Sequence, residues 1–410
     1  MATSKLSRSI SLPMLILYGL GTMIGGGFYA LLGEIAGEAA LFTPLAFLLA
    51  GLLAFISATS FAELSSRFPF SAGEARYAEE GFSNKNFSTL VGWLVILTGI
   101  VSAAALVVAT VGFLQDFISV PQTVAILFLV LTMGGIAGWG IGKSVAFVAV
   151  ISVIEIGALV YIVFVAGDSL LELPSRFQDI FVPTSSTVWL GVFSGAFLGF
   201  YAFIGFEDMV NMAEEVKDVR KNLPIAILVS IFLTTVIYIV VSTIAVLTVS
   251  PEMLSASNTP VAEILRGHGA FSMTMLGIVS LLTGVNGALV QIIMASRVVY
   301  GLSKKDQAPT FLGKINSKTQ TPLRATAIIT FIVLVLAIFF PLQTLAESTS
   351  FIILIIFVIV NLSLWLIKGR ENRDIKQKIS FPRWVSLFGF ITSIVVLVFQ
   401  VWQKFFLNFL

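Results

Sequence analysis

Two stretches of the sequence place glycine in the middle of long apolar runs. The first, "TMIGGGFYA", contains Gly25, Gly26 and Gly27, and the second, "AFIGFEDMV", repeats the Ile-Gly pair at Ile204 and Gly205. A helix that unwinds inside a membrane frees backbone N–H groups that can hold a carboxylate and carbonyls that can hold an ammonium group. An amino acid zwitterion carries both charges. Glycine suits the anion side because it lets a ligand approach the backbone closely.

A second interpretation of the first stretch is helix packing. Gly21 and Gly25 form a small-xxx-small face, a common device for bringing membrane helices close together. The matching Ile-Gly pair in the second stretch favours paired helix breaks, because interrupted helices at corresponding positions are typical of the central site of a transporter.

Three carboxyl groups lie in or beside apolar runs. Glu155, in "AVISVIEIGALVYIV", lies about 18 Å of helical rise from Lys143 and therefore near the middle of the bilayer. It could carry a proton reversibly, or it could stay protonated and hydrogen-bond to a backbone carbonyl. Glu207 and Asp208 follow the second Ile-Gly pair and point about 100° apart on a helix. One could bind a cationic side chain or a proton, and the other could cap the half-helix.

Other polar residues near these runs have two interpretations each. Asn286 and Gln291 could line a site, or they could hydrogen-bond between helices. A charged cluster could form ion pairs of a gate, or it could be a solvated loop; its members are Glu214, Glu215, Lys217, Asp218, Arg220 and Lys221.

Several kinds of chemistry are excluded by composition. The chain has no cysteine and one histidine, His268, which leaves little for thiol catalysis, a Ser-His triad or a zinc site. The stretch "AGWGIGKS" has Ala137 where a phosphate-binding loop needs glycine, and no strand precedes it. A net charge of +2 gives no reason to expect nucleic-acid binding. We therefore expect no catalytic residue, no cofactor and no metal site.

The elements that carry these residues are membrane spans. The chain is 57% hydrophobic and 11% charged, with a mean hydropathy of +1.01, and is an integral membrane protein by composition. A span needs about 20 apolar residues. We predict eleven spans, at 12–37, 39–62, 88–113, 122–138, 143–167, 188–212, 225–249, 272–302, 323–340, 348–367 and 383–403.

The positive charges predict the orientation of these spans. If the N-terminus is cytoplasmic, all of the 24 Lys and Arg residues except Arg176, Arg266 and Lys404 fall at cytoplasmic segments or span ends. The sequence therefore predicts a multi-pass protein of the cell membrane with its C-terminus outside.

The two Ile-Gly pairs also predict an internal repeat. Four spans separate the two interrupted ones, and a unit of five spans returns to the membrane from the opposite face, which makes the repeat inverted. We expect one transmembrane domain over 1–410, with repeats at 12–167 and 188–367 and an additional helix at 383–403.

Several motifs resemble those of the amino acid-polyamine-organocation superfamily. "GLGTMIGGGFYALLGEIAG" is similar to its first-helix signature, and "GFYAFIGFEDMVNMAEEVKDVRKNLPIAI" to its sixth helix and following loop. "TGVNGALVQIIMASRVVYGLSK" resembles the eighth helix, and "INSKTQTPLRAT" the loop before the ninth. Two features depart from the family pattern: many relatives have twelve spans, and Val219 replaces a proline of the loop usually written "KDPRKNLP".

The resemblance implies the leucine-transporter fold, an all-α arrangement of two inverted five-helix repeats, here with one further helix. It implies that the substrate carboxylate meets the backbone of Gly25, Gly26 and Gly27. It places the amino group near carbonyls of Ile24, Tyr201, Ala202 and Ile204, and it makes Tyr201 an aromatic gate. In proton-coupled relatives a lysine of span five titrates near the position of Glu155.

The sequence thus predicts a secondary active amino acid transporter that works by alternating access in the lipid bilayer, with a proton as co-substrate. Two alternatives stay open, an exchanger of amino acids or polyamines and a membrane sensor that transports nothing. The substrate is also open, because Glu207 as a site residue favours arginine, lysine or a polyamine, whereas Phe200 and Phe203 favour neutral or aromatic amino acids.

Overall fold

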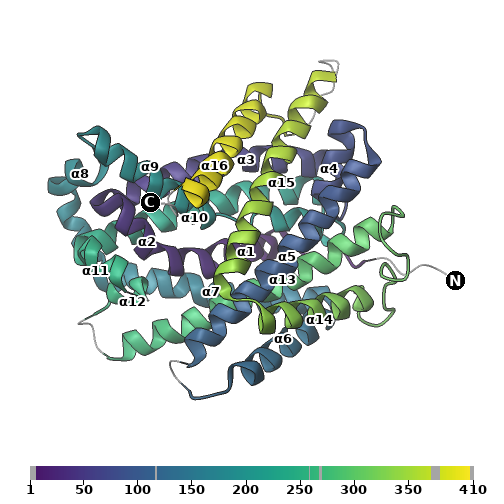
Figure 1. Ribbon diagram of the computed structural model, residues 1–410, viewed down its shortest axis with the longest axis horizontal. Coiled ribbons are helices and arrows are strands. Elements are labelled where there is room, and N and C mark those ends of the chain that lie inside the picture. The colour runs from purple at the N-terminus through teal and green to yellow at the C-terminus, as the bar shows by residue number, and fades with distance from the viewer. Residues whose placement is uncertain (1–5, 116–117, 258, 267–269, 371–378, 407–410) are drawn as a thin grey trace.

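The chain is almost wholly helical in the computed structural model, which describes residues 6–115, 118–257, 259–266, 270–370 and 379–406 (Figure 1). Within these ranges the β-type pairing consists of one isolated bridge between Ile10 and Val216. His268 lies outside the described residues.

The helices of the first half include an interrupted one. A π-helical segment, η1, separates α1 from α2, and the elements in order are α1 (Leu12–Met23), η1 (Ile24–Phe28), α2 (Tyr29–Ala39), η2 (Ala40–Phe42), α3 (Thr43–Arg67), α4 (Gly73–Phe82), α5 (Lys85–Gln115), α6 (Gln122–Gly138) and α7 (Ile141–Ala166).

The second half begins after a short surface segment and is interrupted in its first span. The elements are η3 (Gly167–Glu172), α8 (Leu173–Phe181), α9 (Ser186–Tyr201), η4 (Glu207–Glu215), α10 (Val219–Thr248), α11 (Pro251–Ala256), α12 (Pro260–Glu263), α13 (Ala270–Ser303), α14 (Leu323–Phe339), α15 (Leu342–Arg370) and α16 (Arg383–Phe406).

Length and apolar composition identify the membrane-crossing helices. Among the described residues, seven helices are long and apolar enough to span a bilayer, and four shorter apolar helices of 10–17 residues accompany them. Two of the short ones, α1 and α9, are short because each ends at a helix break. Each of the eleven predicted spans overlaps at least one of these helices.

The span predicted over 188–212 is interrupted directly after Tyr201, close to the Ile204-Gly205 pair that predicted the break. There α9 ends, and the chain makes an irregular turn before the 3-10 segment η4. The turn forms because Gly205 adopts a φ of +125°, which a right-handed helix does not contain.

Helix contacts repeat between the two halves of the chain. α1 packs on α10, and α9 packs on α3; α5 packs on α14, and α13 packs on α6. In chain order, α1, α3, α5 and α6 of the first half correspond to α9, α10, α13 and α14 of the second. Each contact therefore has a counterpart in which the two halves are exchanged. This is the pattern that two inverted repeats produce.

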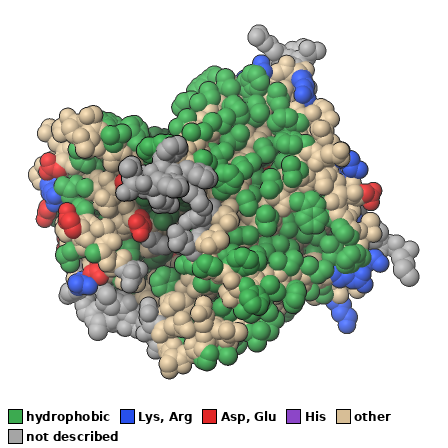
Figure 2. Space-filling model, viewed as in Figure 1, with side chains coloured by type: hydrophobic (Ala, Val, Ile, Leu, Met, Phe, Trp, Pro, Cys, Tyr) green, Lys and Arg blue, Asp and Glu red, His purple; other side chains and the backbone are tan. Residues whose placement is uncertain are grey.

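The surface divides into an apolar band and two polar ends. Figure 2 shows a broad hydrophobic surface with mostly Lys and Arg on its right-hand side and charges of both signs on its left. We call the side that carries α4 and the described start of the chain the basic end, and the side that carries α8, α11 and α12 the opposite end (Figure 1).

Candidate functional site

The first helix break lies within η1. Gly25 has φ −44° and ψ −121°, which is not helical, so the regular hydrogen-bond ladder stops there, and Gly26 belongs to the same segment. Gly27 lies against the other break, since a Cβ atom added to it would be 2.8 Å from Ala202 Cα. Real Cβ atoms do not approach a backbone atom this closely, so the two breaks can meet only with glycine at this position.

The second helix break lies between α9 and η4. A Cβ atom on Gly205 would be 2.9 Å from Thr22 Cβ, and the positive φ of Gly205 is itself costly for other residues. The Thr22 hydroxyl donates a hydrogen bond to the Gly205 carbonyl at 3.1 Å. Glycine on each side therefore brings the two breaks into direct contact.

Tyr238 of α10 joins both breaks, and sequence reasoning missed it. Its hydroxyl lies 2.7 Å from the Met23 carbonyl oxygen and 3.0 Å from the Ala202 carbonyl oxygen. Its ring stacks on Phe28 with centroids 4.3 Å apart. The available signal was a hydroxyl-bearing aromatic residue in the middle of an apolar span, where its hydroxyl needs a partner.

A cavity of about 400 Å³ lies beside the two breaks. Three of the predicted substrate residues line it, namely Gly27, Tyr201 and Ile204. Four others are buried and are not among its lining residues: Ile24, Gly25, Ala202 and Glu207. The remaining lining residues are Thr22, Leu31, Ser102, Ala105, Leu106, Ala109, Gly287, Gln291, Leu342, Ala346, Thr349 and Ser350.

Most of this lining was not foreseen from the sequence. Four of the missed residues carry hydroxyl groups, and they are Thr22, Ser102, Thr349 and Ser350. Thr22 and Ser102 are single small polar residues in apolar spans, whereas Thr349 and Ser350 belong to a polar run at 347–350 near the start of α15. Such residues often bond to their own helix, as Thr22 does to the Gly19 carbonyl at 2.7 Å, so they carry only a weak signal.

The two carboxylates after the second break have different partners. Glu207 Oε2 accepts a hydrogen bond from the Gly205 backbone N–H at 2.8 Å, so this side chain caps the turn. Asp208 Oδ2 accepts a hydrogen bond from Gln291 Nε2 at 2.6 Å, and Gln291 lines the cavity. Asp208 is therefore connected to the cavity through one amide.

Glu74 extends this polar group toward the basic end. It belongs to α4, outside the membrane-spanning helices, and is 1% exposed. Asn211 donates a hydrogen bond to Glu74 Oε1 at 3.1 Å and accepts one from the Gly73 backbone N–H at 3.1 Å. Burial raises the pKa of Glu74 to about 8, and the nearby charge of Glu207 acts in the same direction.

Glu155 lies behind the first break in a cluster of polar groups. Asn286 Nδ2 is 3.2 Å from Glu155 Oε1 and 3.3 Å from Ser152 Oγ. A Cβ atom on Gly21 would collide with Ser152 Oγ at 1.9 Å, so α1 can approach this cluster only with glycine there. Tyr29 of α2 also donates to the Glu155 backbone carbonyl at 3.3 Å. The cluster thus contacts the helices on both sides of η1.

Buried contacts close the bundle at the basic end. The Ile10 N–H donates to the Glu215 carbonyl at 3.0 Å, and the Lys217 N–H donates to the Ile10 carbonyl at 2.9 Å. Arg297 Nε lies 3.3 Å from Glu215 Oε2, and both side chains are fully buried. Within the charged cluster foreseen from the sequence, Glu215 therefore forms an ion pair, whereas Lys217 is exposed.

Comparisons with known proteins assign the chain to a family. The profile of the amino acid permease family matches residues 10–406. The cationic amino acid transporter 3, mitochondrial, of Arabidopsis thaliana is 28% identical over 89% of this chain. This chain spans 63% of the length of that relative. The branched-chain amino acid permease BcaP of Bacillus subtilis (strain 168) is 27% identical over 90% of this chain and 82% of its own length.

A solved structure shows the fold. The crystal structure of MhsT in complex with L-phenylalanine superimposes with a TM-score of 0.66, covering 98% of this chain and 100% of MhsT at 15% sequence identity. The fold is therefore that of the leucine transporter. With the profile match over nearly its whole length, the chain belongs to the amino acid permease family, a family of transporters and not of enzymes.

Proposed function

We propose that the protein is a secondary active transporter of amino acids that works by alternating access around the central cavity. The observation that carries this proposal is the meeting of two broken helices beside a cavity of about 400 Å³. Unpaired backbone groups at such breaks can bind both charges of a zwitterion. Gly25, Gly26 and Gly27 are assigned to its carboxylate, and Ile24, Tyr201, Ala202 and Ile204 to its amino group.

The cavity approaches the opposite end of the bundle. Its lining includes Leu342, the first residue of α15, whereas Arg370, at the other end of that helix, bonds to Ser83 beside α4. The basic end is closed by the Arg297–Glu215 pair. With the N-terminus in the cytoplasm and the end of α16 outside, the conformation is outward-facing in the cell membrane, and Tyr201 gates the cavity.

The described lining favours a neutral amino acid. It contains hydroxyl, amide and apolar groups, but none of its described residues is Asp, Glu, Lys or Arg. Glu207 is assigned to the shape of the site through its bond to Gly205. A cationic side chain would lack a carboxylate partner in this cavity, and a buried unpaired charge is costly.

A proton is assigned as co-substrate, with Glu155 as its carrier. Asn286 can serve both protonation states, because an amide offers a donor and an acceptor. Its Nδ2 now donates to Glu155, and its Oδ1 has no hydrogen-bond partner among the described residues. Rotation of the amide would let Oδ1 accept a hydrogen bond from the protonated acid. Since the cluster contacts α1 and α2, a proton there can bias the helices that hold the substrate.

The proposal is tested with purified protein in liposomes and a panel of labelled neutral amino acids, with arginine and lysine as the cationic comparison. We expect at least one neutral amino acid to accumulate and an inward proton gradient to raise its initial rate of uptake. Glu155→Gln should remove the stimulation. The control is Glu252→Gln, an exposed carboxylate of α11, which should leave it intact.

Each other outcome has a definite meaning. Absence of binding and uptake across the standard amino acids and common polyamines would contradict the substrate class. Exchange that needs no gradient and is unchanged in Glu155→Gln would contradict proton coupling and assign the protein as an exchanger. Binding without flux would assign it as a sensor.

A further inference from the structure

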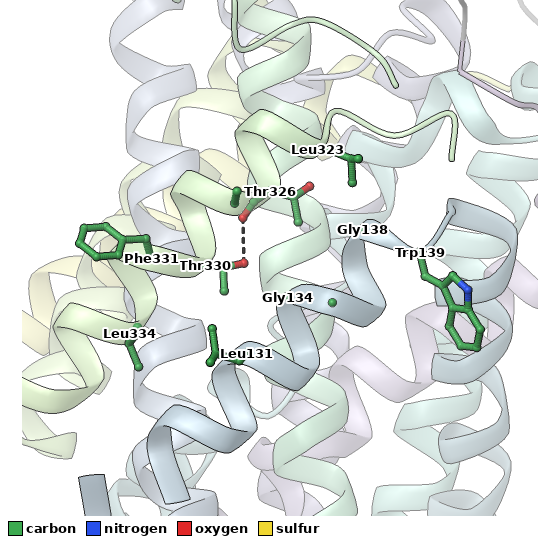
Figure 3. A pocket seen from close by; sticks show the side chains of 11 residues that line it. Leu131, Gly134, Gly138, Trp139, Leu323, Thr326, Thr330, Phe331 and Leu334 are labelled. Atoms are coloured by element: carbon green, nitrogen blue, oxygen red, sulfur yellow. Dashed lines mark hydrogen bonds between the residues drawn. The ribbon is translucent and has the colours of Figure 1, made fainter. Parts of the chain in front are cut away.

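A second cavity lies on the apolar surface and shares no lining residue with the central one. It has a volume of about 530 Å³, within the range of about 300–1,000 Å³ that is typical of ligand pockets. It is a groove between α6 and α14 (Figure 3). Its walls include exposed aromatic side chains, with Trp139 57% and Phe331 65% accessible.

The groove exists because α6 has little side-chain volume on this face. Gly134 sets the distance between the helices, since a Cβ atom there would be 2.5 Å from Thr330 Cγ2. A Cβ atom on the next residue, Gly135, would meet no atom within 4 Å, so this residue faces open space. The Thr326 and Thr330 hydroxyls donate to backbone carbonyls of α14 and its cap at 3.3 and 2.8 Å. The walls are therefore suited to a hydrocarbon chain.

Positive charges lie at one end of this groove. Trp139 and Leu323 mark that end (Figure 3), and Lys143 Nζ lies 5.0 Å from the centroid of the Trp139 ring. Arg324 follows Leu323 in the first turn of α14. Both cations are exposed, and neither has a carboxylate partner in the described part of the chain.

We propose that this groove binds an anionic phospholipid, with an acyl chain between α6 and α14 and the headgroup phosphate at Lys143 and Arg324. Basic residues beside a groove between membrane helices are the arrangement that recognises anionic headgroups. The Trp139 ring lies between the apolar groove and the polar headgroup layer, where tryptophan is favoured in membrane proteins. The charges select the anionic lipid, because a zwitterionic headgroup carries its own cation beside the phosphate.

The test uses the full chain in a neutral detergent, titrated with dioleoylphosphatidylglycerol or dioleoylphosphatidylcholine and monitored by native mass spectrometry. We expect phosphatidylglycerol to bind with a Kd at least tenfold lower than that of phosphatidylcholine. Lys143→Gln combined with Arg324→Gln should remove this difference. Equal affinities for the two lipids in the unmodified protein would overturn the proposal.

A second variant tests the groove separately from the charges. Gly135→Leu fills the open space without a backbone clash and should weaken phosphatidylglycerol binding at least tenfold. The matched control is Gly157→Leu on α7, where an added Cβ atom also meets nothing within 4 Å. Unchanged binding in Gly135→Leu, or an equal loss in both variants, would overturn the assignment of the acyl chain to this groove.

A protein partner is the competing occupant. The chain contains no cysteine, so Gly135→Cys introduces a single thiol into the groove. We expect it to stay monomeric under mild oxidation in native membranes. Efficient formation of a disulfide-linked dimer would assign the groove to a second copy of the chain and not to lipid.

Discussion

The break between α1 and α2 packs on an aromatic ring and on backbone, with one polar cluster around Glu155 behind it, whereas the break between α9 and η4 continues directly into a series of buried polar contacts. At the first, Phe28 stacks on Tyr238 and Gly27 lies against Ala202. After the second, Asp208 bonds to Gln291, Asn211 bonds to Glu74, and Glu215 pairs with Arg297.

This difference indicates that the first break contributes to substrate recognition and the second to holding the basic end closed. At the first break Gly27 lines the cavity with no side chain, which suits recognition of groups that every amino acid shares. The second ties the broken helix to α4 and α13 through charged and amide groups. In the proposed transport cycle, opening of the basic end would separate these buried partners. We therefore expect η4 to contribute most to the free-energy difference between the outward-facing and inward-facing conformations.

The largest effect is expected at the buried ion pair. Glu215→Gln leaves the Arg297 charge uncompensated, which should lower the free energy of unfolding by about 3–5 kcal/mol. Denaturant unfolding in detergent measures it. The control is Glu79→Gln, whose partner Lys305 is 31% exposed, where about 0–1 kcal/mol is expected. Similar losses in the two variants would show that the second break is not held by buried charge.

A smaller loss is expected when the breaks are pushed apart. Gly205→Ala forces a side chain into a φ of +125°, which costs about 1–3 kcal/mol, and presses against Thr22. Substrate affinity should fall together with thermal stability. Gly112→Ala provides the control, since an added Cβ atom there meets nothing within 4 Å. Unaltered substrate affinity in Gly205→Ala would refute the role of close contact between the breaks.

Tyr238→Phe sharpens the comparison by removing one hydroxyl that serves both breaks. Loss of this buried hydrogen bond should cost about 1–3 kcal/mol and weaken substrate binding, because neither break keeps its tether. Tyr18→Phe is the matched control, since the Tyr18 hydroxyl is buried without a hydrogen-bond partner among the described residues. Equal effects in the two variants would contradict the tether.

The last effect is expected at Glu74 and depends on pH. Its pKa rises from the usual 4.5 to about 8 in the folded protein, so the unfolded chain loses the proton first. The unmodified protein should therefore lose stability as the pH rises from about 4.5 to about 8, relative to Glu74→Gln, which has no such proton. Thermal unfolding of both proteins across this range measures the difference. Parallel pH profiles would contradict a buried, protonated Glu74.

Features of the fold that depend on local sequence were predictable. Apolar runs gave the spans, because each helix satisfies its own backbone hydrogen bonds and needs only enough length to cross the bilayer. Short spans were also found correctly, as α6 and α14 show. The break after α9 was predicted from Gly205, although the residues after Tyr201 are as apolar as a helix interior.

The candidate site was predictable only in outline. Gly27, Tyr201 and Ile204 line the cavity as the motifs suggested, yet most of its lining comes from α5 and α15, which carry no motif. The burial of Glu74 was not predicted, because the sequence of α4 is typical of a charged surface helix. Its burial follows from its contact with Asn211, which lies 137 positions away in the chain.

The sequence by itself determined which segments are apolar and where two of them break, since hydrophobicity and glycine flexibility are properties of neighbouring residues. Only the tertiary structure decided which polar groups meet. Tyr238 lies 215 positions from Met23, and Arg297 lies 82 positions from Glu215. Such pairs form because a buried polar group needs a hydrogen-bond partner, and the partner is whichever polar group the packing brings within reach. The residues next to it in the sequence do not indicate which group that is.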